Sequence, residues 1–202
     1  MNLVVLGATG RTGRLVVEQA LAADHSVTAL VRSPQKLAVH SSNLRVATGE
    51  ATDPSAVARA LEGADAVIST LGGSGSVIAD STSAIVAAAR QTGVSRVVVL
   101  SSWLVERDHI GAVTRLLTGL AMGSLVRDKR AGEQELRKSG LDWTIAYASI
   151  LTDAPARGSV AVLAEDARRG LSQKISRADV AAWLVQAAAE DQPTRRNVGI
   201  TG

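Results

Sequence analysis

The chain has 202 residues, of which 46% are hydrophobic and 20% charged, and it contains no cysteine. Domains typically run to about 100–200 residues, so we expect a single domain over residues 1–202. The 22 Lys and Arg residues against 19 Asp and Glu leave a net charge of only +3, with both signs interspersed, which by itself names no partner. A chain without cysteine has no disulfide framework and fits a reducing, intracellular compartment.

The sequence shows no membrane or export segment. The apolar run Leu3–Leu6 is too short for a secretory signal and follows no basic region. No stretch of about 18 uninterrupted apolar residues occurs, so no membrane span is expected. The densest positive segment, Arg127–Lys138, is interrupted by acidic residues and is interpreted as a solvated helix face rather than a nucleic-acid patch. We therefore expect a cytoplasmic protein with neither a membrane nor a nucleic-acid partner.

Short apolar runs alternate with segments of helical periodicity, a pattern typical of parallel strands joined by crossover helices. Strands that are apolar throughout are buried on both faces. The expected fold is therefore α/β, with a doubly wound, mostly parallel sheet and helices on both faces. The predicted strands are Asn2–Leu6, Ser26–Val31, Leu44–Thr48, Ala66–Thr70, Arg96–Leu100, Asp142–Tyr147 and a last short one at Asn197–Ile200.

Helix signals separate these strands. Asp53 and Pro54 mark one helix start, because Asp caps free amides and proline fits the first helical position, and this helix ends near Gly63. Ser176–Asp179 resembles a capping box that leads into a helix. The remaining helices are predicted at Arg11–Ala23, Asp80–Gln91, Arg127–Lys138 and Val180–Ala189.

Two stretches lack regular periodicity, Trp103–Gly123 and Thr152–Lys174. Both follow predicted strands, and ligands of open α/β sheets bind outside the carboxyl ends of the strands. We therefore expect a small substrate-side part formed by about residues 103–125 and 150–175.

A glycine-rich loop joins the first strand to the first helix. Gly7 permits a tight turn, Gly10 lets the backbone approach a pyrophosphate, and Gly13 lets the helix pack closely on the sheet. The free amides and the positive end of the helix then face an anion. Glycine also marks ordinary tight turns, so the strand before the loop and the helix after it are what favour dinucleotide binding. The predicted cofactor residues here are Gly7, Thr9, Gly10, Arg11, Thr12 and Gly13.

The end of the second strand distinguishes the two nicotinamide cofactors. An acidic residue there binds the ribose 2′-hydroxyl of NAD, whereas an arginine accommodates the 2′-phosphate of NADP. This chain has Arg32 there, and the nearest acid, Asp24, precedes the strand. The pattern favours NADP, with a solvent-facing arginine as the alternative.

Two later strand ends add candidate cofactor residues. Asp53 follows the third strand and either lies near the adenine or only caps the next helix. Leu71 and Gly72 follow the fourth strand, where the backbone either lines the central part of the cofactor or forms an ordinary glycine turn.

The pattern as a whole resembles the atypical short-chain dehydrogenase/reductase group, in particular its NmrA-like and biliverdin reductase B-like (flavin reductase) families. The resemblance implies an NADP-binding Rossmann fold in about the first three-quarters of the chain and a small C-terminal substrate-side part. It rests on the Gly7–Gly13 loop and on the segments Ala29–Pro34, Gly93–Arg96, Val99–Ser102, Ser139–Ile145 and Ile175–Val180.

The catalytic pattern departs from that resemblance. Carbonyl-reducing members use a tyrosine four residues before a lysine, and here Leu125 precedes Lys129. Ser101 and Ser102 match a serine pair of the family at a strand end, where a hydroxyl reaches the nicotinamide or merely satisfies the backbone. Ser102 and Lys129 are the candidate catalytic residues, and Ser101 is a candidate cofactor residue.

Two further residues are candidates for the site. Tyr147 replaces an arginine common in the family and either approaches the nicotinamide or packs in the core. His109 lies in the first irregular stretch and has no partner at metal-ligand spacing, so no metal site is expected.

Two functions follow from these residues. The first is an NADPH-dependent reductase of a small planar acceptor such as a flavin or quinone, because hydride transfer to such a ring needs stacking more than a positioned acid. The second is a catalytically silent NADP(H)-binding redox sensor of the NmrA type, which acts through a protein partner. Reduction of a sugar or isoflavone-like carbonyl is a third possibility and requires another proton donor.

Overall fold

The computed structural model describes residues 1–73, 75–106, 109–168, 170, 172–189 and 194–202. The strands are β1 (Asn2–Leu6), β2 (Ser26–Val31), β3 (Leu44–Thr48), β4 (Ala66–Ser69), β5 (Arg96–Ser102), β6 (Asp142–Ala148), β7 (Ile150–Thr152), β8 (Ala161–Leu163), β9 (Lys174–Ser176) and β10 (Arg196–Thr201). The helices are α1 (Arg11–Ala22), α2 (Pro54–Leu61), α3 (Val77–Thr92), α4 (Ala112–Lys138) and α5 (Arg177–Ala189), with short 3-10 turns η1 (Pro34–Lys36) and η2 (Trp103–Val105).

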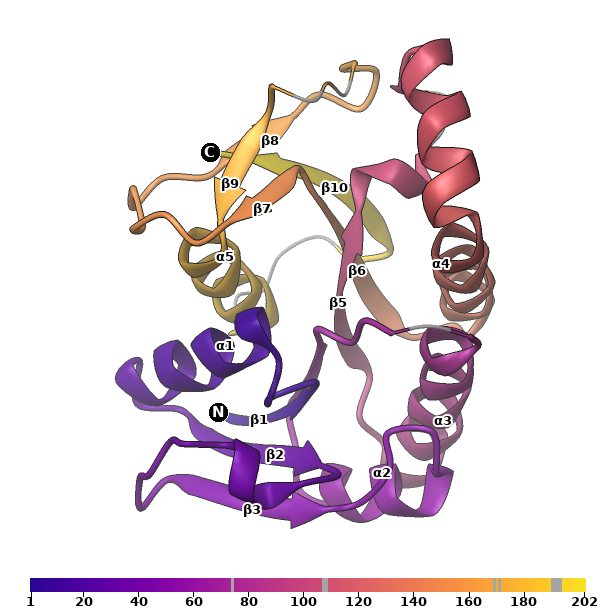
Figure 1. Cartoon of the computed structure of the whole chain (residues 1–202). Helices are drawn as coiled ribbons and strands as arrows, with labels where there is room; N and C mark the ends of the chain where they lie inside the picture. Colours follow the sequence, from indigo (N-terminus) through magenta and orange to yellow (C-terminus); the bar gives the residue numbers. More distant parts are fainter. Residues whose placement is uncertain (74, 107–108, 169, 171, 190–193) are drawn as a thin grey trace.

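The main sheet has the order β3-β2-β1-β4-β5-β6-β10-β8 (Figure 1). All neighbours pair in parallel except β8, which runs antiparallel to β10 at the edge. The order reverses between β1 and β4, and this is the crevice in which doubly wound sheets bind ligands. The predicted Rossmann-type fold is confirmed, and β7 and β9 form a separate small sheet.

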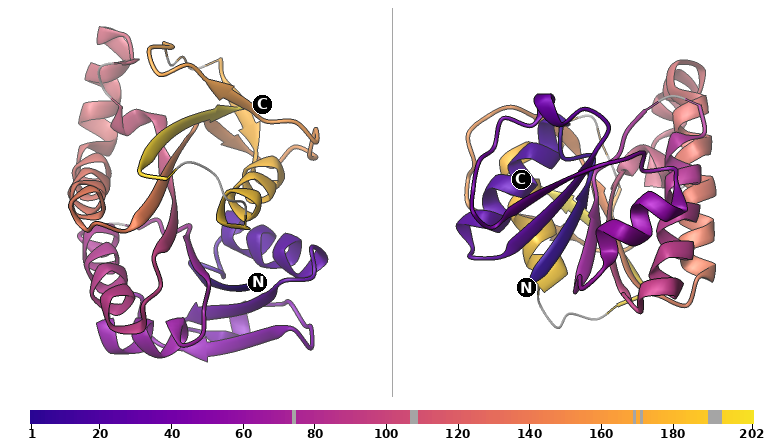
Figure 2. Two further views of the ribbon diagram at one scale, coloured as in Figure 1. Left: turned by 180° about the vertical axis from the view of Figure 1, so that it is seen from behind. Right: turned by 90° about the horizontal axis from the view of Figure 1, so that it is seen from below.

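Helices cover both faces of the sheet (Figure 2). Along β1, Leu3 and Val5 pack into the core layer shared with α1 and α5. Val4 and Leu6 pack into the opposite layer, which lies under α2 and α3 and reaches Leu136 of α4. Successive residues of a strand point to opposite faces, so an uninterrupted apolar strand supplies both layers.

Helix α4 begins earlier than predicted. The stretch Trp103–Gly123 was predicted to be irregular, but α4 begins at Ala112 and continues to Lys138, with a kink at Met122 (φ −129°, ψ 16°). The segment shows no regular periodicity of apolar residues, which suggested irregular structure. A glycine inside a helix costs only about 1 kcal/mol relative to alanine, and the surrounding Leu, Ala and Arg residues favour a helix. The second irregular stretch, Thr152–Lys174, contains β8.

Helix α3 begins at Val77, before the predicted start at Asp80. Its first turn is capped by Asp128 of α4, whose carboxylate accepts from the amides of Ile78 and Ala79 at 3.0 and 2.9 Å. A cap supplied from another helix leaves no signal in the local sequence. Within the described residues, no helix is long and apolar enough to cross a membrane.

Candidate nucleotide-binding site

The loop between β1 and α1 is closed by backbone contacts. Gly7 adopts a left-handed conformation (φ +83°), and the Gly10 amide donates to its carbonyl at 2.9 Å. A Cβ on Gly13 would lie 2.1 Å from the Gly7 carbonyl oxygen. Real Cβ atoms do not approach so closely, so only glycine lets α1 begin directly above this turn.

The N-terminus of α1 is suited to an anion. Gly10 caps the helix without a side-chain hydrogen bond, and the first turn holds no acidic residue. The first amides of a helix lack partners within it and carry the positive end of its dipole. A phosphate placed there receives hydrogen bonds from the backbone alone.

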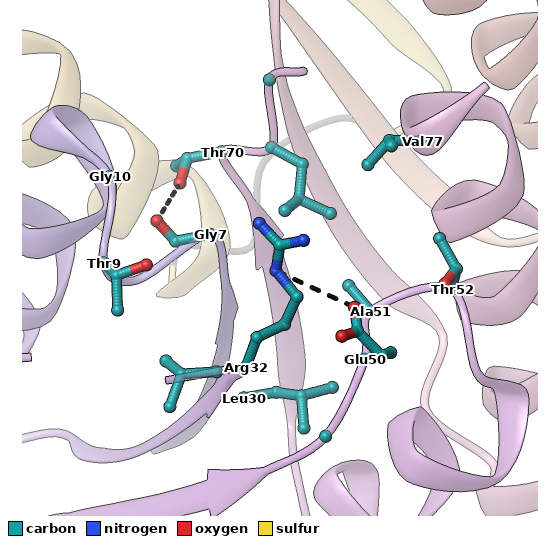
Figure 3. Close-up of a pocket in the computed structure, with 14 residues that line it drawn as sticks. Gly7, Thr9, Gly10, Leu30, Arg32, Glu50, Ala51, Thr52, Thr70 and Val77 are labelled. Atoms are coloured by element: carbon teal, nitrogen blue, oxygen red, sulfur yellow. Dashed lines mark hydrogen bonds and ion pairs between the residues drawn. The ribbon is translucent and has the colours of Figure 1, made fainter. Parts of the chain in front are cut away.

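A cavity of about 250 Å³ lies beside this loop, at the carboxyl ends of β1, β2, β3 and β4 (Figure 3). It is lined by six of the predicted cofactor residues: Gly7, Thr9, Gly10, Arg32, Leu71 and Gly72. The rest of its wall comes from Leu30, Val31, Gly49, Glu50, Ala51, Thr52, Thr70 and Val77. The main chain of four strand ends and one cation therefore converge on a single hollow, as a dinucleotide requires.

Arg32 and Glu50 form an ion pair on the cavity wall. Arg32 Nε lies 3.8 Å from Glu50 Oε2, and the two side chains are 76% and 59% exposed. An ion pair this open to water is worth at most about 1 kcal/mol. Because this ion pair is weak, the Arg32 guanidinium is available to bind an incoming phosphate.

The remaining predicted cofactor residues lie elsewhere. Thr12 is buried below the loop, and Gly13 contacts the Gly7 carbonyl as described. Asp53 caps α2, because its carboxylate accepts from the Ser55 amide at 2.9 Å. Its neighbour Thr52 lines the cavity instead.

Arg11 faces an adjoining recess of about 550 Å³ on the other side of the loop. There it forms an ion pair with Asp153, whose other oxygen receives a hydrogen bond from Arg177 at 2.7 Å. This contact joins the start of α1 to the segment after β7 and to the start of α5. The expected substrate-side segment thus touches the nucleotide loop through Asp153.

The polar residues at the ends of β5 and β6 meet around Glu133 of α4, which is only 4% exposed. Its carboxylate accepts from Ser101 at 2.6 Å, from Tyr147 at 2.5 Å and from Arg137 at 3.2 Å. Burial, together with the negative charge of Glu133, raises the pKa of Tyr147, so the phenol keeps its proton and donates a hydrogen bond with it. Tyr147 therefore packs in the core with its hydroxyl satisfied.

The two candidate catalytic residues take different positions. Ser102 ends β5, and its hydroxyl accepts from the Leu104 amide at 3.3 Å. Lys129 is half-buried, and its ammonium group donates to the Leu100 carbonyl of the same strand at 3.3 Å. Burial lowers the pKa of Lys129, while the carboxylates of Glu133 and Asp128 oppose that change.

Sequence reasoning missed three acidic residues. Of the acids after the third strand, Asp53 was predicted to lie near the cofactor, whereas the structure places Glu50 on the cavity wall. Asp128 and Glu133 were assigned to a solvated helix face, although both are buried. The spacing of Glu133 four residues after Lys129 places them on one face of α4, and that shared face was the available signal.

The chain matches the family model described as NAD(P)H-binding over residues 7–191. A curated relative, the uncharacterised sugar epimerase YhfK of Bacillus subtilis strain 168, is 30% identical over all of this chain and 94% of its own. ChuY of Escherichia coli O157:H7, described as an anaerobilin reductase, is 26% identical with a TM-score of 0.83 over 99% of this chain and 96% of its own.

A short-chain dehydrogenase/reductase of Veillonella parvula DSM 2008, solved in complex with NADP, shares the fold. It has a TM-score of 0.83 at 22% identity, over 100% of this chain and 94% of its own. The predicted resemblance is confirmed by these matches together with the cavity geometry. The chain belongs to the NAD(P)H-binding family, and its likeness to the atypical short-chain dehydrogenase/reductase group is a likeness of fold.

Proposed function

We propose that this protein is an NADPH-dependent reductase of a small planar acceptor such as a flavin or quinone. The observation that carries the proposal is the single cavity that combines the uncapped start of α1 with the Arg32 guanidinium at the end of β2. The first feature suits a diphosphate and the second suits a 2′-phosphate.

The residues of the cavity fit such a cofactor. Gly7 and Gly10 line the cavity and carry no Cβ, so phosphate oxygens can approach the backbone of the loop there. Arg32 presents a planar, permanently charged group to the adenosine end. When bound, NADPH supplies a hydride from its reduced nicotinamide.

The acceptor class follows from the residue at the usual position of the proton donor. Leu125 stands four residues before Lys129, and a leucine has no proton to give. A planar ring that accepts a hydride takes its proton from water afterwards, so orientation is the main requirement. We assign Ser102 to the nicotinamide end of the site. Lys129 acts through its hydrogen bond to Leu100, by holding the end of β5 in place.

ChuY supports this choice, because it is described as an anaerobilin reductase and its fold covers nearly all of this chain. The YhfK relative carries an epimerase name without an established substrate. The proposal also includes a small-molecule acceptor as the only partner during turnover and a cytoplasmic location, where reduced nicotinamide is available.

Leu125 also favours a second candidate, a silent NADP(H) sensor of the NmrA type that reports redox state to a protein partner. Such a protein binds NADPH without oxidising it. Because it acts by contacting a protein partner, it needs no pocket for an acceptor molecule.

Steady-state NADPH oxidation separates the two functions. The purified protein is assayed with FMN, riboflavin and a soluble quinone, under nitrogen and with NADPH binding measured on the same preparation. The reductase proposal predicts saturable oxidation with at least one acceptor and a higher KM for NADPH in Arg32→Ala. Tight NADPH binding with no oxidation by any acceptor contradicts the reductase and supports the sensor.

A further inference from the structure

Arg32 and Glu50 lie close together, just after the ends of two neighbouring strands of the sheet. Strands β2 and β3 pair in parallel, with Val31 opposite Thr48, and the Gly49 amide donates to the Val31 carbonyl at 3.0 Å. Arg32 and Glu50 are the next residues along the chain beyond this contact, just after the ends of β2 and β3. The register of the sheet therefore fixes a cation and an anion on the same wall of the nucleotide cavity.

Figure 3 shows how the pair is arranged. Arg32 Nε lies 3.8 Å from Glu50 Oε2, and its two terminal nitrogens point away from the carboxylate. Both residues line the cavity together with Gly7 and Thr9 of the phosphate loop. A nucleotide seated on that loop meets both charges at once.

These two charges suit different coenzymes. The guanidinium attracts the 2′-phosphate of NADPH, which carries a charge close to −2. A carboxylate repels that phosphate, and it accepts a hydrogen bond from the free 2′-hydroxyl of NADH. In a cavity that bound NADPH alone, an exposed carboxylate beside the arginine would only weaken binding, because it repels the 2′-phosphate.

We propose that Glu50 determines coenzyme specificity by opposing Arg32, so that the cavity binds NADH as well as NADPH. This inference rests on the proposed function, because it concerns the same nucleotide site. Glu50 offsets part of the charge of Arg32 before any ligand arrives. It also supplies the hydroxyl acceptor that is missing from the end of β2.

The exposure of the Arg32 and Glu50 side chains sets how much Glu50 changes the coenzyme preference. Both side chains are more than half exposed, so water and salt screen their interaction with each other and with a phosphate. Removing the charge of Glu50 therefore changes the NADPH to NADH preference by about two- to fivefold at low ionic strength. The change shrinks as salt is added.

The test measures dissociation constants of NADPH and NADH for the wild type and three variants by calorimetric titration. Glu50→Gln removes the carboxylate charge with little change of shape. Glu62→Gln is the matched control, since Glu62 lies in a separate recess at the amino ends of the strands, with Asn2 and Ser26. Arg32→Ala removes the opposing charge.

The inference predicts that the wild type binds both coenzymes. Glu50→Gln binds NADPH more tightly and NADH no more tightly, Glu62→Gln matches the wild type, and Arg32→Ala shifts the preference towards NADH. An unchanged or lowered NADPH preference in Glu50→Gln overturns it, as does a wild type that binds NADPH alone. Both of those outcomes leave the proposed reductase standing, whereas a folded wild type that binds neither coenzyme overturns both.

Discussion

The Tyr147 hydroxyl donates a hydrogen bond to the Glu133 carboxylate across the interface between β6 and α4, with Oη and Oε2 2.5 Å apart. Tyr147 is 2% exposed and Glu133 is 4% exposed, so neither group reaches bulk water easily. Ser101 and Arg137 complete the partners of the carboxylate. A buried charge that keeps several hydrogen bonds is stable, and it becomes costly when those bonds are left incomplete.

We therefore predict unequal effects of two substitutions in this network. Tyr147→Phe removes one donor and lowers the free energy of unfolding by about 1–2 kcal/mol. Glu133→Ala leaves the other groups buried without their acceptor and lowers it by about 3–5 kcal/mol. Urea unfolding at neutral pH measures both, with the exposed Glu165→Gln as control. Equal small losses in the two variants would show that the network contributes little.

Gly13→Ala tests the packing of the nucleotide loop. The new Cβ would meet the Gly7 carbonyl oxygen at 2.1 Å, so the start of α1 must move. We expect a loss of about 3 kcal/mol or more in unfolding free energy, together with weaker NADPH binding. Gly123→Ala is the control, because its Cβ would meet only the end of the Arg127 side chain, at 3.4 Å. A Gly13→Ala protein as stable as the wild type would contradict the loop geometry.

Asp179 gives the stability a pH dependence. Burial by itself would raise the pKa of Asp179, but hydrogen bonds from the Arg157 amide, Ser176 and the Gly158 amide bring it below its ordinary value. The folded state therefore binds this proton less readily than the unfolded state. The stabilisation is complete above the unfolded pKa and is lost as the pH falls through the folded pKa.

The comparison of the wild type with Asp179→Asn measures that contribution. We expect a difference in unfolding free energy of about 2 kcal/mol at neutral pH, because an amide cannot accept all of these hydrogen bonds. The difference should narrow as the pH falls below about 4. Urea denaturation at a series of pH values provides the readout, and a difference that grows towards acid would refute the assignment.

The sequence predicted the sheet well because its strands are short apolar runs that end at turn signals. The Gly7–Gly13 loop and Arg32 were predicted for the same reason, since their roles depend on local backbone geometry and on a strand end. The capping box was confirmed too, because Ser176 accepts from the Asp179 amide at 2.9 Å.

The features that were missed depend on contacts between distant segments. Asp128 caps a helix 50 residues away in the sequence, and Glu133 joins partners from β5 and β6. Glu50 became significant only when the register of β2 and β3 placed it beside Arg32. The first half of α4 was predicted to be irregular because it lacks regular periodicity, although most of its residues favour a helix.

Calorimetric titration with NADPH tests whether the Gly7–Gly13 loop and Arg32 bind a phosphorylated dinucleotide. We predict saturable binding at one site per chain in the wild type. Arg32→Ala should weaken NADPH binding by about ten- to a hundredfold, as expected for the loss of a charge-assisted contact, and should affect NADH far less. A folded protein that gives no binding heat with either NADPH or NADH at millimolar concentration would contradict the account.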